Sequence, residues 1–567
     1  MSSEINTILV SDPRISRISS DIHVAVKEGP ASCVVQGYKT NSNSNSTTLF
    51  NVNVPSENTL VDRNLRINGT IHLTLEIKTV GEIPQSNFTV VPAAFPLNQA
   101  LQSASLTLNN SKVSVQSADI LNVITKQYEQ RFLSKHIQTT PSYVDKYFGV
   151  ATDAMNGVHT SGWGCGIENA EKDSDTTGRG DSDLTLAFYT ADGTLVPAGQ
   201  QLTAGTTFYV QLELNVSEPI LGMPTLEFKE DEASFMGINS LELVLQYNDF
   251  KNVFNCKLDI VQSVIAGSKY GAATDLFLTD DTKLMTRQMS LHPSQYAKLN
   301  TKNVLPFDEF IAYKSSIDLP GDGQAISQVS TQVISMRQVP DKIYVLIRPQ
   351  YRAQKQIWSN NLMFPITSVN IVFNNKAGLL SEMTQKELYQ MSRRNGSQQS
   401  WNEFRGKVRD GNRNLFTSLG SIVVIDPVRD LGLDDILSSG SLGQFGFQAM
   451  VSANEIHNIT NTVVGSMELV VIASYGGTMI TQQGSSMTMS GLLTKTSVLE
   501  AKENSKSAID FEALSELSGG NFAKKGITAV GDLLKKHRVG IGKAVGDKIS
   551  GSGSYNQTGG SKLSKYM

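Results

Sequence analysis

The residue types that most often carry chemistry are scattered along this chain. Seven histidines occur, and none stands in a metal-binding spacing such as His-Glu-x-x-His. They are His23, His72, His136, His159, His292, His457 and His537. Three widely separated cysteines, Cys33, Cys165 and Cys256, are odd in number, which argues against a disulfide framework. We therefore expect a protein that is not an enzyme, with no catalytic residues, no cofactor and no metal site.

Two glycine-rich segments do not fit a phosphate-binding loop. Gly162-Trp163-Gly164-Cys165-Gly166 follows no strand pattern and opens no helix pattern. Gly540-Ile541-Gly542-Lys543 lacks both the upstream glycine and the following Ser or Thr of a P-loop. Neither segment predicts nucleotide binding.

One acidic segment, residues 168–183, has the composition of a cation-binding loop. Its carboxylates are Glu168, Glu171, Asp173, Asp175, Asp181 and Asp183. Calcium prefers six to eight oxygen ligands, yet a solvated surface loop explains the same composition and is the interpretation that we favour. The segment also contains Arg179-Gly180-Asp181, the tripeptide of integrin ligands, which we interpret as a chance match.

The composition excludes several other classes. The net charge is −4, so we expect no bulk attraction to nucleic acid. No apolar run is long enough to span a membrane, and the first residues lack the basic and apolar start of a signal peptide. We expect the chain to be made and kept in a cytosolic type of compartment.

Strand patterns dominate the segments that would have to position any site. Ile71, Leu73, Leu75 and Ile77 alternate with polar residues, as in a strand with one buried face. Further strands are expected at residues 208–214, 241–245, 310–313, 326–334, 343–347, 369–373, 422–425, 445–451 and 467–473. The second half thus offers roughly eight strands, enough for one antiparallel sandwich.

The same order of elements occurs twice, about 265 residues apart. A Phe-Pro entry, an alternating strand, an Asn-Asn stop and a helix follow one another in each half. The segments are 95–97, 105–110 and 117–132 in the first half, and 364–366, 368–375 and 384–394 in the second. Ser117 is the expected cap of the first helix, and Thr384 with Glu387 forms a capping box for the second. This echo predicts one β-rich domain built twice, with chance as the alternative.

The length fits that duplication. At 567 residues the chain is too long for one hydrophobic core. We expect an extended arm at residues 1–20, a first sandwich at 21–265, a second at 266–498, and a flexible tail at 499–567.

The charge is segregated between the body and the end of the chain. Residues 521–567 contain nine basic and two acidic side chains, a net charge of +7, which leaves −11 for residues 1–520. The basic residues are Lys524, Lys525, Lys535, Lys536, Arg538, Lys543, Lys548, Lys562 and Lys565. Gly526, Gly531, Gly540, Gly542 and Gly546 disfavour a stable helix, so we expect the tail to order only against a partner.

The second half contains a series of separated motifs in a fixed order. They are the segments 340–349, 365–380, 388–392, 395–396, 401–404, 425–433 and 470–477. Together they resemble the major capsid proteins of Polinton-like viruses, which belong to the double jelly-roll lineage of double-stranded DNA viruses. The close match covers residues 326–480.

The resemblance implies an all-β fold of two tandem eight-stranded antiparallel jelly rolls, with short helices in long loops. It also implies that three subunits form a pseudo-hexagonal capsomer, which tiles an icosahedral shell around double-stranded DNA. The expected partners are other copies of the chain, penton proteins and minor capsid proteins. The expected location is the virion capsid, assembled inside the infected host cell. The basic tail would face inward, toward DNA, a lining protein or a membrane.

The resemblance assigns structural roles to the motif residues. Asn374, Asn375 and Gly378 would leave a strand through turns that tolerate positive φ, and Trp401 and Phe404 would anchor the returning loop. The other motif residues are Leu388, Tyr389, Asn395 and Gly396.

Two other functions use a β-sandwich. The main alternative is a spike protein that binds a receptor or a carbohydrate. A sandwich hydrolase would need an acid pair or a catalytic triad, which these motifs do not supply.

Overall fold

The computed structural model describes most of the chain up to Ser490. The described residues are 8–11, 24–27, 32–56, 59–79, 83–84, 90–129, 133, 184–203, 205–224, 234–248, 250, 253–256, 261–265, 276–290, 303–318, 320, 324–350, 363–409, 415–417, 420–433, 439–455, 466–482 and 484–490. Among them, no helix is both long and apolar enough to cross a membrane.

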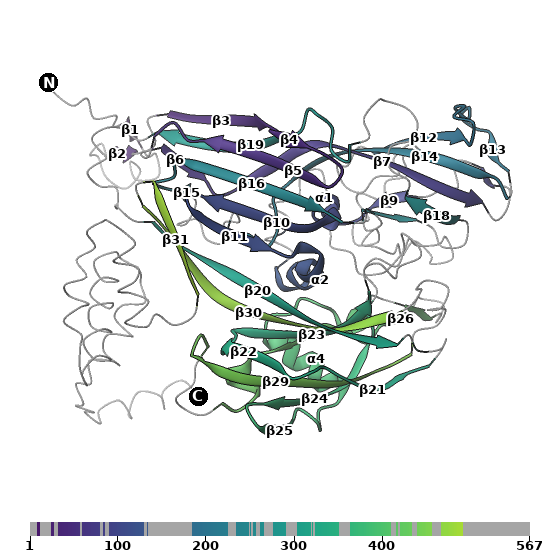
Figure 1. The fold of residues 1–567 in the computed structure, drawn as a ribbon, viewed down its shortest axis with the longest axis vertical. Helices are drawn as coiled ribbons and strands as arrows, with labels where there is room; N and C mark the ends of the chain where they lie inside the picture. Colours follow the sequence, from purple (N-terminus) through teal and green to yellow (C-terminus); the bar gives the residue numbers. More distant parts are fainter. Residues whose placement is uncertain are drawn as a thin grey trace. The chain divides into compact units, whose positions relative to one another are not determined.

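The first jelly roll consists of two antiparallel sheets (Figure 1). Its main strands are β3 (Ser32–Lys39), β5 (Thr47–Asn53), β6 (Thr59–Asp62), β7 (Arg66–Thr79), β10 (Leu101–Leu108), β11 (Ser111–Val115), β14 (Thr207–Glu218), β16 (Ser240–Tyr247) and β19 (Lys283–Ser290). In one sheet, β3 pairs with β19, β19 with β6 and β7, and β7 with β14. In the other sheet the order is β5, β16, β10, β11.

Shorter strands decorate this first jelly roll. They are β1 (Ile8–Ser11), β2 (Val24–Lys27), β4 (Ser42–Asn43), β8 (Ile83–Pro84), β9 (Val90–Pro92), β12 (Leu184–Thr190), β13 (Gln201–Leu202), β15 (Ser234–Phe235), β17 (Phe254–Cys256) and β18 (Val261–Ile265). The pairing of β1 with β2 places a short strand inside the segment 1–20, for which the sequence predicted an extended arm.

The second jelly roll repeats the strand order of the first. Its strands are β20 (Asn303–Asp318), β21 (Ile326–Ser330), β22 (Ile334–Gln338), β23 (Lys342–Pro349), β24 (Ile366–Phe373), β25 (Lys376–Leu379), β26 (Lys407–Arg409), β27 (Leu415–Thr417), β28 (Val423–Ile425), β29 (Leu442–Ala453), β30 (Ser466–Gln482) and β31 (Ser485–Ser490). One sheet has the order β20, β30, β23, β28, and in the other β21 and β22 both pair with β29, followed by β24 and β25.

Both sandwiches therefore have the same topology. With β6 and β7 taken as one interrupted strand, and β21 and β22 as another, one sheet joins the first, eighth, third and sixth strands. The other sheet joins the second, seventh, fourth and fifth, which is the jelly-roll arrangement. The prediction of two tandem jelly rolls is confirmed.

The predicted boundary between the jelly rolls lies too early in the chain. The sequence placed it between residues 265 and 266, because no strand was recognised between Leu245 and Phe310. Strand β19 pairs with β3 over its whole length, so the first jelly roll extends to Ser290. The second begins with β20 at Asn303. In a jelly roll the eighth strand returns to lie beside the first, and only this long-range pairing assigns β19 to its sheet.

The Asn-Asn turns adopt the backbone that the sequence predicted. Asn374 and Asn375 have φ values of 47° and 66°, and Gly378 has a φ of 78°. In the first half, Asn109 has a φ of 52°, and its side-chain oxygen accepts a hydrogen bond from the Asn239 amide at 2.8 Å. Asn tolerates this left-handed region better than most residues because its short polar side chain can hydrogen-bond locally. Each turn joins the fourth strand of its jelly roll to the fifth.

Five helices are described: α1 (Pro96–Ala100), α2 (Ser117–Gln127), α4 (Gln385–Arg394), α5 (Trp401–Phe404) and α6 (Pro427–Asp430). The predicted capping box of α4 is confirmed, since Thr384 and Glu387 satisfy each other's backbone N–H groups. The predicted cap of α2 is wrong. Its N-cap is Gln116, and Ser117 is the first helical residue, with its hydroxyl buried. The predicted strand 326–334 is two strands, β21 and β22. Between them, the Thr331 amide donates to the carbonyl oxygen of Ala449, and the Ala449 amide donates to the Thr331 hydroxyl.

Several predicted features lie outside the described residues. These are the acidic segment 168–183 with Arg179-Gly180-Asp181, the glycine-rich segment 162–166, and the whole tail 499–567 with its basic side chains.

Candidate functional site: the junction between the two jelly rolls

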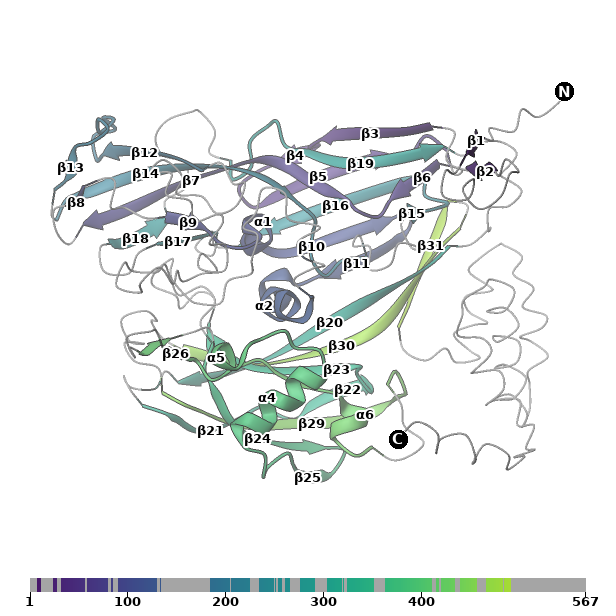
Figure 2. The ribbon, with the colours of Figure 1, turned by 180° about the vertical axis from the view of Figure 1, so that it is seen from behind.

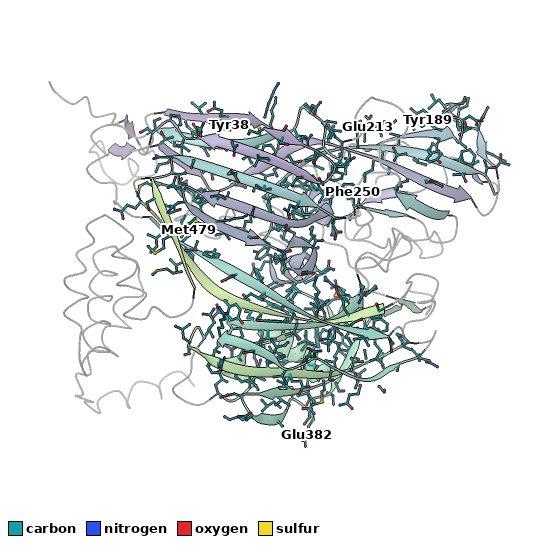
Figure 3. All side chains as sticks on the ribbon, in the orientation of Figure 1. Tyr38, Tyr189, Glu213, Phe250, Glu382 and Met479 are labelled. Carbon is teal, nitrogen blue, oxygen red and sulfur yellow. The ribbon has the colours of Figure 1, made fainter. Side chains whose placement is uncertain are left out.

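In the sheet formed by β20, β30, β23 and β28, the strands β23, β28 and most of β30 are buried on both faces. In β23, Ile343, Val345 and Ile347 belong to the core of the second jelly roll. Tyr344 and Leu346 alternate with them and belong instead to the cluster that contains the core of the first jelly roll. Strands β28 and β30 divide in the same way, with Val470 and Ile472 of β30 on the junction side. Met479 of β30, labelled in Figure 3, is also in this cluster.

This apolar contact fuses the two jelly rolls. Tyr344, Leu346, Val470 and Ile472 are each at most 2% exposed. Burial of one such side chain contributes about 1.5–3 kcal/mol, so these four alone stabilise the junction substantially. The two jelly rolls are therefore not independent domains joined only by a linker, because the hydrophobic cluster of the first continues into the second.

Helix α2 is the main element of the first jelly roll at this junction, and it lies between the two sandwiches in Figure 1. The segment that follows β14 packs directly against this helix. A Cβ atom at Gly222 (φ 81°) would lie 2.7 Å from Cδ1 of Ile124, so only glycine lets this segment approach the helix. Asn98 of α1 fixes the same segment, since its side-chain oxygen accepts from the Leu221 amide at 2.9 Å.

A buried carboxyl group holds α1 against the end of β14. Glu218 is fully buried and accepts hydrogen bonds from the Leu97 amide at 3.2 Å and from the Asn98 side chain at 3.0 Å. Burial raises the pKa of Glu218 to about 7, although these hydrogen bonds act in the opposite direction. The end of β14, just before the segment that packs against α2, thus contains a group that titrates near neutral pH.

Arg348 of β23 connects the second jelly roll to the first turn of α2. Its Nη2 lies 2.7 Å from Oδ1 of Asp119, and its Nη1 donates to the carbonyl oxygen of Ala118 at 3.0 Å. Its Nε donates to Oε1 of Glu468 on β30 at 2.7 Å. Asp119 also pairs with Lys314 of β20 at 2.6 Å. One guanidinium group thus bridges both jelly rolls.

The charges in this bridge are almost completely buried. The side chains of Arg348, Asp119 and Glu468 are 6%, 8% and 10% exposed. Burial alone would lower the pKa of Arg348, but the charges of Glu468 and Asp119 outweigh burial and raise it. Arg348 therefore stays charged, and loss of either carboxylate would leave its charge buried without full compensation.

A second buried ion pair closes the other end of α2. Lys126 Nζ lies 2.8 Å from Oε1 of Glu403, with side-chain exposures of 9% and 5%. The other carboxylate oxygen of Glu403 accepts from the Ser400 amide in the capping box of α5. The Gln398 amide donates to the carbonyl oxygen of Lys126 at 2.7 Å. Helix α2 therefore faces the segment between α4 and α5, as Figure 2 shows.

Four of the predicted motif residues form one cluster beside this contact. Tyr389 of α4 packs against Trp401 and Phe404 of α5, with ring centroids 5.3 and 5.6 Å apart. Phe404 and Leu388 are fully buried in the core of the second jelly roll. The aromatic rings therefore fix α5 to α4, which agrees with the predicted anchoring role of Trp401 and Phe404.

Asn395 and Gly396 lie where α4 ends and the junction begins. The Asn395 side chain donates to the Val424 carbonyl oxygen at 2.9 Å and to Asp430 at 2.6 Å, which ties α4 to β28 and α6. Its backbone carbonyl oxygen accepts from the Gln127 side chain at 3.3 Å. Gly396 has a φ of 104°, and a Cβ atom there would lie 2.5 Å from Gln127 Nε2. Asn374, Asn375 and Gly378 lie outside this contact.

The sequence did not identify the charged residues of the junction. Arg348 stands next to Pro349 in the run from Lys342 to Pro349, which was interpreted as an ordinary strand. A signal for a second buried face was nevertheless present. Residues 343–347 and 469–473 are continuously apolar and do not alternate with polar residues, as in strands that are buried on both faces. A charged residue at the end of such a run has to find a buried partner.

No candidate metal centre is found among the described residues, since no three or more His, Cys, Asp or Glu side chains are grouped to hold an ion. Cys33 is exposed and not in a disulfide, and its sulfur lies 2.9 Å from Nε of Arg287.

Comparison with known proteins gives matches to both jelly rolls. A family model described as "Sputnik virophage major capsid protein 1st domain" matches residues 3–285, and one described as "Major capsid protein V20 C-terminal domain" matches residues 313–477. The putative capsid protein V20 of Sputnik virophage is 22% identical over an alignment of 544 residues, which covers 91% of this chain and 85% of the relative.

Two solved structures share the fold over nearly their whole length. The cryo-EM structure of the Sputnik virophage matches with a TM-score of 0.65 at 18% identity, over 91% of this chain and 99% of that chain. The crystal structure of the mavirus major capsid protein matches with a TM-score of 0.62 at 17% identity, over 90% of this chain and 99% of that chain.

The Arg348 bridge predicts a large loss of stability when its cation is removed. Arg348→Met should lower the free energy of unfolding by about 3–5 kcal/mol, because Asp119 and Glu468 stay buried without their partner. Urea unfolding measures this loss. Adding Asp119→Asn and Glu468→Gln should recover part of it, since the uncompensated charges disappear. Arg337→Met on β22, where the side chain is exposed, should change stability by less than about 0.5 kcal/mol. Equal stabilities of the two single variants would contradict the role of Arg348.

Glu218 predicts a pH dependence of defined sign. Its pKa rises from an ordinary 4.5 to about 7, so between these values the folded chain binds a proton that the unfolded chain has lost. Stability should therefore fall as pH rises through this window, by on the order of 3 kcal/mol, and stay level above it. Glu218→Gln should lack this decline, and the exposed Glu242→Gln should keep it. Urea unfolding at a series of pH values tests this, and parallel curves for all three proteins would contradict it.

Proposed function

We propose that this chain, a double jelly-roll major capsid protein, closes as a homotrimer into a pseudo-hexagonal capsomer that tiles an icosahedral shell around double-stranded DNA. It is a structural component of the virion capsid and not an enzyme. The trimer, the six-sided outline and the enclosed genome are the parts of this statement that we infer.

The observation that carries the proposal is the rigid junction between two domains of equal topology. Two like domains in each of three chains give six like edges, which is what a hexagonal lattice requires from one gene product. The angle between the two domains must then be fixed within the chain. The shared apolar cluster and the Arg348 bridge supply this rigidity.

The contact between neighbouring chains has a candidate surface on the first jelly roll. Strand β3 is the first strand of its jelly roll and, among the described strands, pairs only with β19. Val34 and Val35 on this edge are 55% and 64% exposed. An exposed apolar edge strand invites association, so soluble proteins usually cover or charge it. Strand β20, its counterpart in the second jelly roll, contacts α2 of the same chain, and Ile311 on it is less exposed, at 39%. We infer that a neighbouring copy covers β3.

We also propose that the chain comes from a Polinton-like virus. The motifs between residues 340 and 477 support this narrower assignment. A phylogeny of full-length double jelly-roll capsid proteins tests it, and a position inside the virophage branch would contradict it.

The remaining partners follow from the geometry of a closed shell. Trimers of this kind fill the faces, so the fivefold vertices need a penton protein and the seams between capsomers need minor capsid proteins. We propose that the basic tail faces inward and contacts DNA, because its charge of +7 contrasts with −11 on the rest of the chain. A lining protein or an internal membrane is the alternative destination of the tail.

The trimer predicts a particle of about 185 kDa in mass photometry, three times the 61.7 kDa of one chain. Val35→Glu should shift the population toward single chains, because it places a charge on the covered edge of β3. Leu195→Glu, at a residue that is 56% exposed outside this edge, is the matched control and should stay trimeric. A wild-type chain that stays monomeric across salt and pH would count against the whole proposal.

The tail predicts DNA binding that weakens steeply with salt. Fluorescence anisotropy with duplex DNA should show affinity falling by orders of magnitude between about 50 and 200 mM salt, since each neutralised phosphate releases counterions. Removal of residues 521–567 should abolish most of this binding and impair genome retention, with trimers intact. The control is removal of residues 551–567, which contain only two of the nine basic residues, Lys562 and Lys565. Proteolysis that clips the tail as readily in intact particles as in free trimers would contradict an inward position.

A further inference from the structure

A cavity of about 260 Å³ lies at the junction, between α2 and the sheet of the second jelly roll. Its walls come from α2, β20, β30 and from β23 with the residue before it. Val123 and Ile124 of α2 form an apolar side, each 2% exposed, and Phe310 of β20 adds an aromatic ring. This volume is too large for a single bound ion and suits a small organic molecule.

The polar side of the cavity carries two carboxylates and one ammonium group. These belong to Asp308 of β20, to Asp341 and to Lys342 of β23. Asp308 is exposed and marks the side that is open to solvent, whereas Asp341 and Lys342 are half-buried. The formal charge of the three groups is −1. One further positive charge would balance them.

The surroundings penalise this charge excess. Loss of water around its carboxyl group raises the pKa of Asp341. The same loss of water raises the pKa of Asp308, and the nearby charge of Asp341 raises it further. Burial also lowers the pKa of Lys342. A bound cation would offset the repulsion between the carboxylates.

A tyrosine side chain adds a further polar group to the wall of the cavity. Tyr344 is 2% exposed and lines the cavity, close enough to Asp308 and Asp341 to feel their charges. A hydroxyl group in the wall of the cavity can accept a hydrogen bond from a ligand or donate one to it.

We propose that the junction cavity binds a small organic cation that carries a primary ammonium group on an aliphatic chain. The ammonium group lies between Asp308 and Asp341 and donates to the Tyr344 hydroxyl. The aliphatic chain packs against Val123, Ile124 and the ring of Phe310. Because the ligand contacts both jelly rolls, its binding stabilises their mutual orientation. The proposal does not depend on the trimer, since one chain contains the whole cavity.

Isothermal titration of the full-length chain with 1,4-diaminobutane tests this site. We expect saturable binding of one molecule per chain and a melting temperature that rises with ligand concentration. Asp308→Asn and Asp341→Asn should each weaken binding by about tenfold or more, equivalent to about 1.4 kcal/mol. Tyr344→Phe should weaken it less, with the ligand-free melting temperature showing that each variant is folded. Asp318→Asn, which removes an exposed carboxylate from the same strand, should bind like the wild type.

Two further titrations separate this proposal from simpler explanations. 1,4-Butanediol has the same length without charge and should not bind. Magnesium chloride at matched ionic strength should neither bind saturably nor displace the diamine. The proposal is overturned if magnesium competes, if Asp318→Asn weakens binding as much as Asp308→Asn, or if the heat of diamine binding does not saturate.

Discussion

The arrangement of this molecule depends on one buried guanidinium group. Arg348 lies between Asp119 of the first jelly roll and Glu468 of the second, and it also contacts the backbone of α2. Burying three charges costs desolvation energy, which the attraction within a protein often only offsets. The bridge therefore need not add much net stability. Its contribution is directional, because another angle between the sandwiches would separate Asp119 from Arg348, which would keep only Glu468 on the paired strand β30.

The apolar part of the junction acts differently. Hydrophobic burial is proportional to area and has little preference for direction, so Leu346, Val470 and Ile472 hold the domains together without fixing their angle. The two ion pairs sit at opposite ends of α2, with Asp119 in its first turn and Lys126 in its last. Two such points fix the orientation of a rod. A capsid subunit needs this combination, since small errors of angle would accumulate across a shell.

The local features of the fold were predictable from the sequence, and the long-range ones were not. The alternation from Ile71 to Ile77, the positive φ at Asn374 and the capping box at Thr384 each depend on neighbours a few residues away. Arg348 and Asp119 are 229 residues apart, and nothing in a single sequence joins them. The same limit explains the missed strand β19, whose place is set by pairing with β3, about 250 residues earlier. Only the continuous apolar runs in β23 and β30 indicated that these strands are buried on a second face.

The duplication also shows where the two halves diverged. Helices α2 and α4 both follow the fifth strand of their jelly rolls, and each has an acidic residue in its first turn and a basic residue in its last. In α2 these residues, Asp119 and Lys126, are buried against the second jelly roll. In α4, Glu387 is exposed and serves its own capping box, which lowers its pKa. The same element thus serves as the internal joint in the first copy, where it packs against the second jelly roll, and carries an exposed capping box in the second copy.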